Sequence, residues 1–218
     1  MSQMSKKKNN TALYVKISYN CLAGALYIKR RMKAFMMRGI SHLYYWLSGW
    51  KLEGRLPKEI KKCILVAAPH TSNFDFGYSR AALYMMNLPV RYLAKKELLE
   101  SPLGFFFKAT GAIGVGRDKS EDLVSRMVEL LTKSKEMVIM LSPEGSRKIK
   151  GKWKTGFYYA ALQAKVPIVL SSLDYKKKVA NVGPSFFPTG DYHKDMEQVK
   201  EYYKNIVPKY PEKFVLNI

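Results

Sequence analysis

Cysteine and histidine are scarce in this chain of 218 residues, which contains two cysteines and three histidines. Two thiols cannot build the disulfide framework on which small secreted domains depend. Cys21 and Cys63 lie far apart, and the scattered histidines give no zinc-ligand spacing. The sequence therefore predicts neither a disulfide scaffold nor a zinc centre.

Several common motifs of phosphate binding and nucleophilic catalysis are also missing. The chain has no G-x-x-x-x-G-K-[ST] phosphate loop and no G-x-S-x-G elbow of a serine hydrolase. Gly114 and Gly116 begin a G-x-G pattern, but Lys119 stands where a dinucleotide fingerprint has its third glycine. These absences argue against the enzyme classes that depend on such motifs.

Acidic residues are few, 17 against 38 basic ones, so the formal net charge is +21. Such a positive field favours an anionic partner: nucleic acid, an anionic membrane surface, or a phosphorylated or acidic substrate. Hydrophobic residues make up 47% of the chain and aromatic residues 13%, which excludes global disorder. This composition suffices for the core of one domain.

The first 52 residues contain ten basic side chains and no acidic one, since the first acid is Glu53. Nucleic-acid arms are usually basic and polar, whereas this stretch is also rich in Leu, Ile, Met, Tyr and Trp. A basic and apolar helix is typical of the bilayer interface. We therefore expect residues 1–52 to associate with a membrane and residues 53–218 to form the main domain. The alternative is a pair of ordinary capping helices with solvated charges.

Long uncharged runs are missing from this segment, where the longest, 17–28 and 39–50, have twelve residues each. A membrane span needs about 20 apolar residues. The basic start imitates a secretory signal, but Lys16 and Asn20 interrupt the apolar stretch that follows it. The pattern therefore predicts a segment that associates with the membrane surface, and neither a span nor a cleaved signal.

From residue 62 onward, short apolar runs alternate with helix-like stretches. Strands are expected at 63–69, 90–94, 113–115, 137–141, 166–175 and 178–187, and helices at 76–86, 121–134, 155–165 and 196–206. This alternation predicts an α/β fold: a single layered domain with a mostly buried mixed sheet flanked by helices, preceded by N-terminal amphipathic helices.

His70 and Asp75 follow the first expected strand in the stretch P-H-T-S-N-F-D. Open α/β sheets build their sites at such strand ends. A carboxylate that accepts from one imidazole nitrogen leaves the other free to take a proton from a substrate hydroxyl. Taken alone, the spacing also fits a buried histidine satisfied by a nearby acid. His42 and His193 are expected to be structural or exposed.

A second polar turn, P-E-G-S-R, also follows an expected strand and comprises Glu144, Gly145, Ser146 and Arg147. Arg147 can hold phosphate oxygens in a fork while Glu144 accepts from a hydroxyl or fixes the arginine. An exposed ion pair on a turn is the alternative. Arg117 ends a third, glycine-rich stretch and is likewise suited to an anion.

These motifs together resemble those of the glycerolipid acyltransferases of the 1-acylglycerol-3-phosphate type. His70 and Asp75 match the H-x4-D motif, P-E-G-S-R matches E-G-[ST]-R, and the stretch ending at Arg117 stands in the place of the second motif. V-P-I at 166–168 stands in the place of the fourth. The resemblance covers residues 54–188.

The resemblance implies transfer of a fatty acyl group from acyl-CoA or acyl-carrier protein to the hydroxyl of a lysophospholipid or related glycerolipid, in phospholipid biosynthesis. It implies His70 as general base, Asp75 as its orienter, and no metal or redox cofactor. It further implies an enzyme at the cytoplasmic face of the inner (cell) membrane, peripheral or monotopic, with no nucleic acid partner. The substrate-binding residues that it implies are Glu144, Gly145, Ser146, Arg147 and Arg117.

Some features leave alternatives open. Gly114 and Gly116 stand where the family often has a proline and a polar residue, which predicts a looser loop before Arg117. The stretch K-W-K at 152–154 is either a second interfacial contact or a tryptophan packed over the outer wall of a substrate tunnel. The whole chain could also be a non-catalytic basic module that binds lipid or nucleic acid, or a hydrolase that uses water as acceptor.

Overall fold

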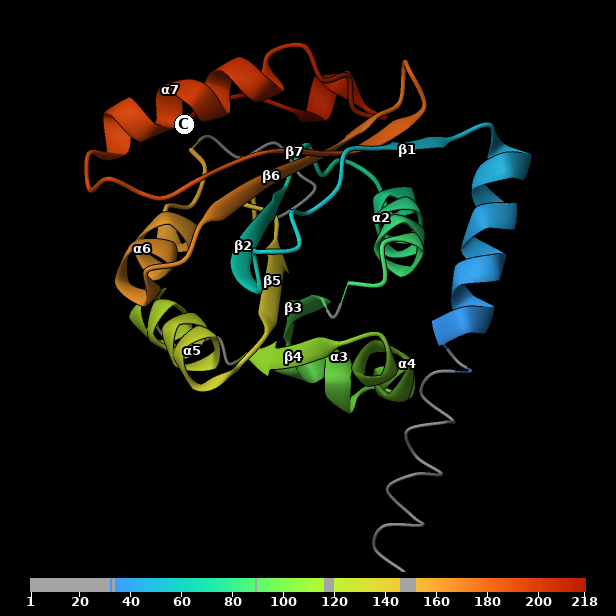
Figure 1. Cartoon of the computed structure of the whole chain (residues 1–218), viewed down its shortest axis with the longest axis horizontal. Coiled ribbons are helices and arrows are strands. Elements are labelled where there is room, and N and C mark those ends of the chain that lie inside the picture. Colours follow the sequence, from blue (N-terminus) through green and yellow to red (C-terminus); the bar gives the residue numbers. More distant parts are fainter. Residues whose placement is uncertain (1–31, 33, 89, 116–119, 146–151) are drawn as a thin grey trace, which may run out of the picture.

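Seven strands form one mixed sheet at the centre of the molecule, in the order β1-β7-β6-β2-β5-β3-β4 (Figure 1). The structure is a computed structural model that describes residues 32, 34–88, 90–115, 120–145 and 152–218. β7 runs antiparallel to β6, and all the other neighbouring pairs are parallel. The strands are β1 (Lys51–Glu53), β2 (Lys62–Ala67), β3 (Val90–Lys95), β4 (Ala112–Val115), β5 (Met137–Leu141), β6 (Ile168–Asp174) and β7 (Val179–Phe186).

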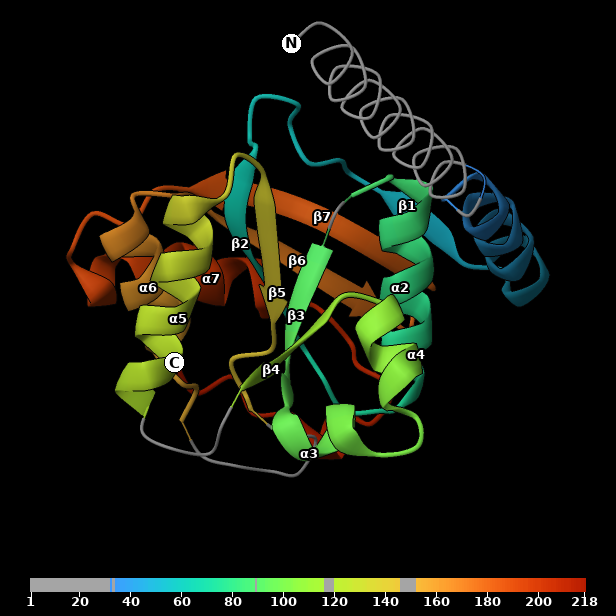
Figure 2. The same ribbon diagram turned by 90° about the horizontal axis from the view of Figure 1, so that it is seen from below.

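Helices cover both faces of the sheet, as Figure 2 shows with α5, α6 and α7 on one side and α2 and α4 on the other. The helices are α2 (Phe74–Met85), α3 (Lys96–Glu100), α4 (Gly104–Ala109), α5 (Ser120–Lys133), α6 (Gly156–Ala164) and α7 (Tyr192–Tyr203), with a short 3-10 helix at Pro211–Lys213. Covering both faces explains why β2 is a nearly continuous apolar run, as parallel strands in such sheets usually are.

Side chains of β2 alternate between two apolar clusters, as the pleat of a strand requires. Ile64 and Val66 pack in the larger cluster, with residues of α5, α6 and α7. Cys63 and Leu65 point the other way, toward Leu83 of α2. Burial raises the pKa of the Cys63 thiol to about 12, so this cysteine is an apolar core residue that stays protonated.

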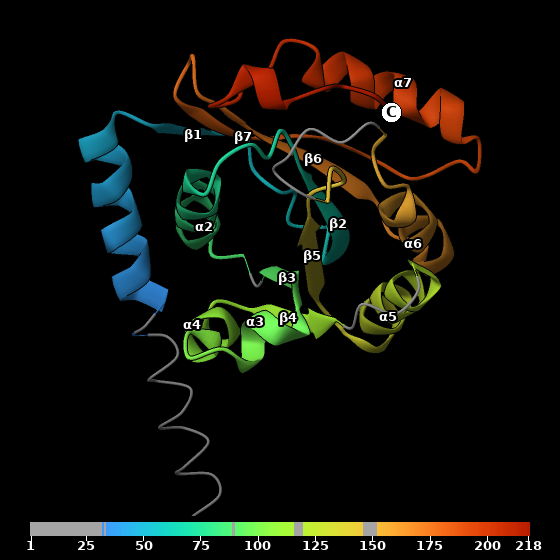
Figure 3. The same ribbon diagram turned by 180° about the vertical axis from the view of Figure 1, so that it is seen from behind.

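A helix over residues 34–48, called the N-terminal helix below, lies beside α2 (Figure 3). Its Tyr45 is buried together with Trp50 against Ala81 and Ala82 of α2, and the Tyr45 hydroxyl donates to the backbone oxygen of Tyr78 at 2.8 Å. No helix in the described part of the chain is long and apolar enough to span a bilayer.

The predicted α/β class is confirmed, and all ten strands and helices expected after residue 62 are present with small shifts at their ends. The elements that the sequence did not predict are short: β1, α3, α4 and the 3-10 helix. β1 has three residues and forms by pairing with β7, which is 126 or more positions away in the chain. Such an element carries no periodicity of its own. The boundary proposed at residue 52 stays a prediction, and β1 lies across it.

Gly54 directly follows β1 and has a φ of +69°, and a Cβ at this position would overlap the carbonyl oxygen of Val182 on β7. Gly49 has nearly the same φ, +70°, but its Cβ would meet only the flexible side chain of Lys178 at 3.6 Å. We therefore expect Gly49→Ala to lower the free energy of unfolding by about 1 kcal/mol, the cost of a left-handed backbone. Gly54→Ala should cost at least about 2 kcal/mol, because the overlap adds to that cost.

Urea unfolding followed by circular dichroism measures both variants. Equal losses of unfolding free energy in Gly49→Ala and Gly54→Ala would show that β1 does not pack against β7 as described.

Candidate active site

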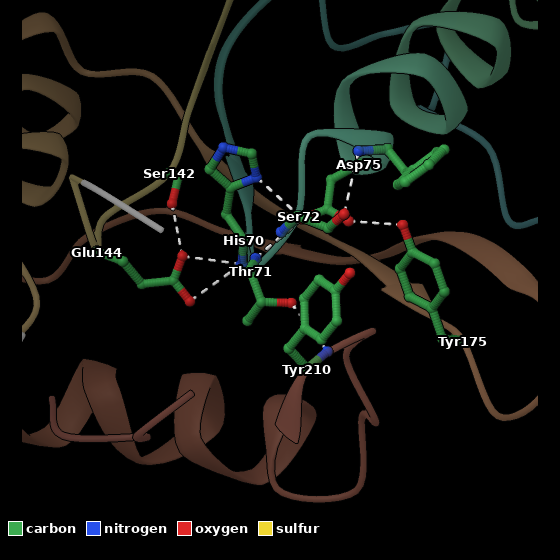
Figure 4. A network of polar contacts seen from close by, with 9 residues as sticks. His70, Thr71, Ser72, Asp75, Ser142, Glu144, Tyr175 and Tyr210 are labelled. Atoms are coloured by element: carbon green, nitrogen blue, oxygen red, sulfur yellow. Dashed lines mark hydrogen bonds and ion pairs between the residues drawn. The ribbon is translucent and has the colours of Figure 1, made fainter. Parts of the chain in front are cut away.

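Three neighbouring strands deliver the polar residues of the site to one edge of the sheet. β5, β2 and β6 lie side by side and run parallel, so their carboxyl ends meet at the same edge. His70 follows β2, Glu144 follows β5 and Tyr175 follows β6. Residues more than 70 positions apart in the sequence thereby come into contact (Figure 4).

His70 and Asp75 form a hydrogen-bonded pair, with 3.0 Å between Nδ1 of the imidazole and Oδ2 of the carboxylate. The Asp75 side chain is 5% exposed and that of His70 is 31% exposed. A charged carboxylate can only accept, so the proton of the bond lies on Nδ1. The other ring nitrogen, Nε2, has no hydrogen-bond partner among the described residues and is free to accept a proton.

The turn between β2 and α2 holds Asp75 in place. Asp75 lies in the first turn of α2, and its Oδ2 also accepts from the backbone N–H groups of Thr71 and Ser72, each at 2.9 Å. Its Oδ1 accepts from the Tyr175 hydroxyl at 2.6 Å. Both carboxylate oxygens therefore have donors, as a buried charge requires.

Hydrogen bonding sets the charge of this buried acid. Burial opposes ionisation, but the hydrogen bonds from the His70 side chain, the Tyr175 hydroxyl and the Ser72 backbone outweigh it and lower the pKa of Asp75 below its ordinary value. Asp75 is consequently a carboxylate at neutral pH, and it stabilises a positive charge on the imidazole.

Glu144 lies next to His70, as the sequence predicts, but its partner was not anticipated. Its two carboxylate oxygens accept from the backbone N–H of His70 at 2.8 and 3.1 Å, and one of them also accepts from the Ser142 hydroxyl at 2.8 Å. Burial raises the pKa of Glu144, and these hydrogen bonds offset the effect in part. Glu144 thus ties the turn after β5 to the histidine, and its contact with substrate stays a prediction.

Gly145 ends the described part of this turn, with a φ of +66° that favours glycine. Ser146 and Arg147 lie outside the described residues, as does Arg117. β4 runs parallel to β3, and β3 to β5, so Val115 ends at the same sheet edge as the turn with Glu144. The binding roles predicted for Ser146, Arg147 and Arg117 remain predictions.

The ring of Trp153 does not make the interfacial contact considered for residues 152–154. Trp153 is 4% exposed and packs edge-on against Tyr203 with 5.4 Å between the ring centroids. Its ring belongs to the larger apolar cluster, where it cannot reach a membrane. The sequence could not show that the ring is buried, because a buried tryptophan and an interfacial one can have the same flanking lysines. The tertiary contacts of the ring decide between the two.

The sequence did not point to Tyr175 and Ser142. Each stands at or just beyond the end of a predicted strand, and that position was the available signal. His42 is exposed on the N-terminal helix, and His193 lies at the start of α7 beside the ring of Tyr192. Within the described residues, no group of three or more His, Cys, Asp or Glu side chains is arranged to hold a metal ion.

Residues 50–171 match the model of the protein family described as Acyltransferase. The chain belongs to the Acyltransferase family. The matched segment contains both His70 with Asp75 and the turn with Glu144, so the resemblance inferred from the motifs is confirmed at the level of the family.

Two curated relatives are both named as 1-acyl-sn-glycerol-3-phosphate acyltransferases. The chain is 30% identical over 164 residues to the 1-acyl-sn-glycerol-3-phosphate acyltransferase of Haemophilus influenzae, which covers 68% of this chain and 66% of that protein. It is 28% identical over 167 residues to the human 1-acyl-sn-glycerol-3-phosphate acyltransferase beta, and this match covers 72% of this chain and 56% of the human protein. The matches thus span just under two thirds and little more than half of these relatives.

Among solved structures, this acyltransferase-family chain resembles the crystal structure of the 1-acyl-sn-glycerophosphate (LPA) acyltransferase PlsC from Thermotoga maritima, with a TM-score of 0.54. The match covers 82% of this chain and 78% of that one, at 15% sequence identity. At that identity the likeness is one of fold, and it agrees with the mixed sheet flanked by helices described above.

Replacing Asp75 by Asn tests the charge of this carboxyl through the pH dependence of stability. Because the pKa of Asp75 is lowered in the folded protein, its contribution is complete above the ordinary carboxyl range and is lost as the pH falls through the folded pKa. We expect Asp75→Asn to lower the free energy of unfolding by about 1–3 kcal/mol at neutral pH. The difference from the wild type should stay constant between about pH 7 and about pH 5 and shrink as the pH falls further toward about 3.

Urea unfolding at several pH values measures this difference, with Glu212→Gln, an exposed acid, as control. A gap between wild type and Asp75→Asn that stays constant across this range would contradict a charged Asp75.

Proposed function

We propose that this protein transfers a fatty acyl group from an acyl thioester, acyl-CoA or acyl-carrier protein, to the hydroxyl of a lysophospholipid or related glycerolipid. The observation that carries the proposal is the His70–Asp75 pair, whose outer imidazole nitrogen is free, in a chain of the Acyltransferase family. The names of the two curated relatives support the glycerolipid acceptor.

In the proposed reaction, Nε2 of His70 takes the proton of the acceptor hydroxyl while its oxygen attacks the thioester carbonyl carbon. Asp75 accepts from Nδ1–H, which fixes the tautomer and stabilises the imidazolium that forms. The tetrahedral intermediate then breaks its C–S bond, and His70 returns the proton to the departing thiolate. The products are an ester and a free thiol, and no acyl-enzyme is required.

The acceptor is an anion if it carries a phosphate, and the expected partners are the arginines after β4 and β5. We propose that Arg117 and Arg147 bind this phosphate, with Glu144, Gly145 and Ser146 shaping the turn beside His70. The support is the position of the strands that precede them, which end at one sheet edge. The net charge of +21 also suits the phosphates of CoA or an acidic carrier protein.

We further propose that the N-terminal helix docks the enzyme on the cytoplasmic face of the cell membrane. On its inner side Ser41 and Tyr45 are buried against the domain, while its outer side exposes large apolar side chains at helical spacing. Phe35 and Trp46 are 82% and 76% exposed. The outer apolar residues are Phe35, Met36, Ile40, Leu43, Trp46 and Leu47. An outward apolar face beside Arg38 is suited to a bilayer interface with anionic headgroups.

Mass spectrometry of the lipids made from mixed lysolipid acceptors and mixed acyl donors tests the reaction. We expect diacyl products from the wild type, and a rate at least about a hundredfold lower for His70→Ala, since general-base catalysis contributes that much. His193→Ala, at the start of α7, is the matched control and should behave like the wild type.

Release of free fatty acid without ester formation would instead favour a hydrolase. Tight salt-sensitive binding of DNA without acyl transfer would favour the non-catalytic module.

Co-sedimentation with vesicles that contain anionic lipid tests the membrane face. We expect a variant with Phe35→Ser, Trp46→Ser and Leu47→Ser to bind at least about tenfold more weakly, because each apolar side chain contributes through its buried area. Phe187→Ser removes another exposed aromatic ring outside this helix and should bind normally. Undiminished binding of the triple variant would exclude the N-terminal helix as the docking element.

A further inference from the structure

Tyr175 contacts the catalytic pair from the side opposite His70. It follows β6, the strand next to β2, and its hydroxyl donates to Oδ1 of Asp75 at 2.6 Å. The other carboxylate oxygen, Oδ2, is the one that faces the imidazole. Tyr175 therefore touches Asp75 without touching the imidazole, 100 positions away from the acid in sequence.

The Tyr175 hydroxyl donates to the carboxylate oxygen of Asp75 that the turn before α2 does not hold. Thr71, Ser72 and His70 all donate to Oδ2. Among the described residues, Oδ1 has the Tyr175 hydroxyl as its donor. Without that hydroxyl the carboxylate would be held at one oxygen and could turn about its Cβ–Cγ bond. A short bond to a charged acceptor at the second oxygen prevents this rotation.

Aromatic packing keeps the Tyr175 ring in place. Trp50 meets it edge-on with 4.9 Å between ring centroids, and Tyr78 of α2 meets it at 6.0 Å and a right angle. Trp50 and Tyr78 stack on each other at 4.1 Å. The backbone N–H of Tyr175 is also fixed, because it donates to the oxygen of Val207 at 2.8 Å.

The same surroundings keep the hydroxyl protonated. Burial, followed by the hydrogen bond to Asp75 and the charge of that carboxylate, raises the pKa of Tyr175 far above its ordinary value. The titratable groups around the two residues are His70 and Glu144 near Asp75, and Tyr78 and Tyr44 near Tyr175. Tyr175 is thus a permanent donor to the acid.

We propose that Tyr175 is a positioning residue for acyl transfer: it locks the Asp75 carboxylate in the orientation in which Oδ2 holds the His70 imidazole. The inference rests on the proposed function, and it adds a third member to the pair. The N-terminal helix contributes indirectly, because Trp50 lies two residues beyond its end and packs on Tyr175.

Steady-state kinetics of Tyr175→Phe, which removes a single hydroxyl, tests the proposal. We expect kcat to fall about tenfold, as expected for a charged hydrogen bond that acts through an intermediary, with the KM of both substrates unchanged. The acidic limb of the pH dependence of kcat should move to higher pH, because the hydrogen bond from Tyr175 helps to lower the pKa of Asp75 and its loss lets Asp75 take up a proton at higher pH. Tyr202→Phe is the matched control, since it removes a hydroxyl that contacts Ser172 at 3.0 Å.

A second readout does not depend on catalysis. Acid unfolding of Tyr175→Phe, followed by circular dichroism, should occur at higher pH than that of Tyr202→Phe, because Asp75 loses a donor to its charged form. A Tyr175→Phe enzyme with the kcat and pH profile of the wild type would overturn the proposal while leaving the proposed function intact. So would a rise in KM alone, or an unchanged acid unfolding transition.

Discussion

One buried carboxylate organises the site. Asp75 is almost entirely withdrawn from water, and an unpaired charge in such a place would be strongly unfavourable. It is charged because two backbone amides, an imidazole and a phenol all donate to it. These donors come from the turn after β2 and the end of β6, so the charge ties two strands together at the point where the imidazole emerges. Any change that removes the charge affects both the local fold and the orientation of the His70 imidazole.

The parallel sheet makes this convergence possible. β5, β2 and β6 are neighbours that end at one edge, and each adds one part: the carboxylate of Glu144, the imidazole of His70 and the hydroxyl of Tyr175. Glu144 holds the backbone of His70 while Asp75 holds its side chain. The backbone and the side chain of His70 are therefore both held in place, which is what the proposed general base needs.

Local patterns in the sequence predicted the elements and the His70–Asp75 pair, because strand length, helix spacing and a five-residue separation are all short-range features. The partner of Glu144 and the role of Tyr175 were not predictable in this way, since they depend on which strands become neighbours. Trp153 shows the same limit: its flanking lysines suggested an interface, but packing against Tyr203 buries the ring. Hydrogen bonds between residues of different strands were missed, and the hydrogen bond within one motif was found.

The proposed dependence of acyl transfer on the Asp75 charge can be measured directly. The decisive comparison is kcat for acyl transfer to a lysolipid by the wild type and by Asp75→Asn, from about pH 5 to about pH 8 at saturating substrates. If Asp75 orients the imidazole and stabilises the imidazolium that forms, the variant should be slower by at least about a hundredfold across the range, with KM values close to those of the wild type. Wild-type turnover by Asp75→Asn would contradict the account.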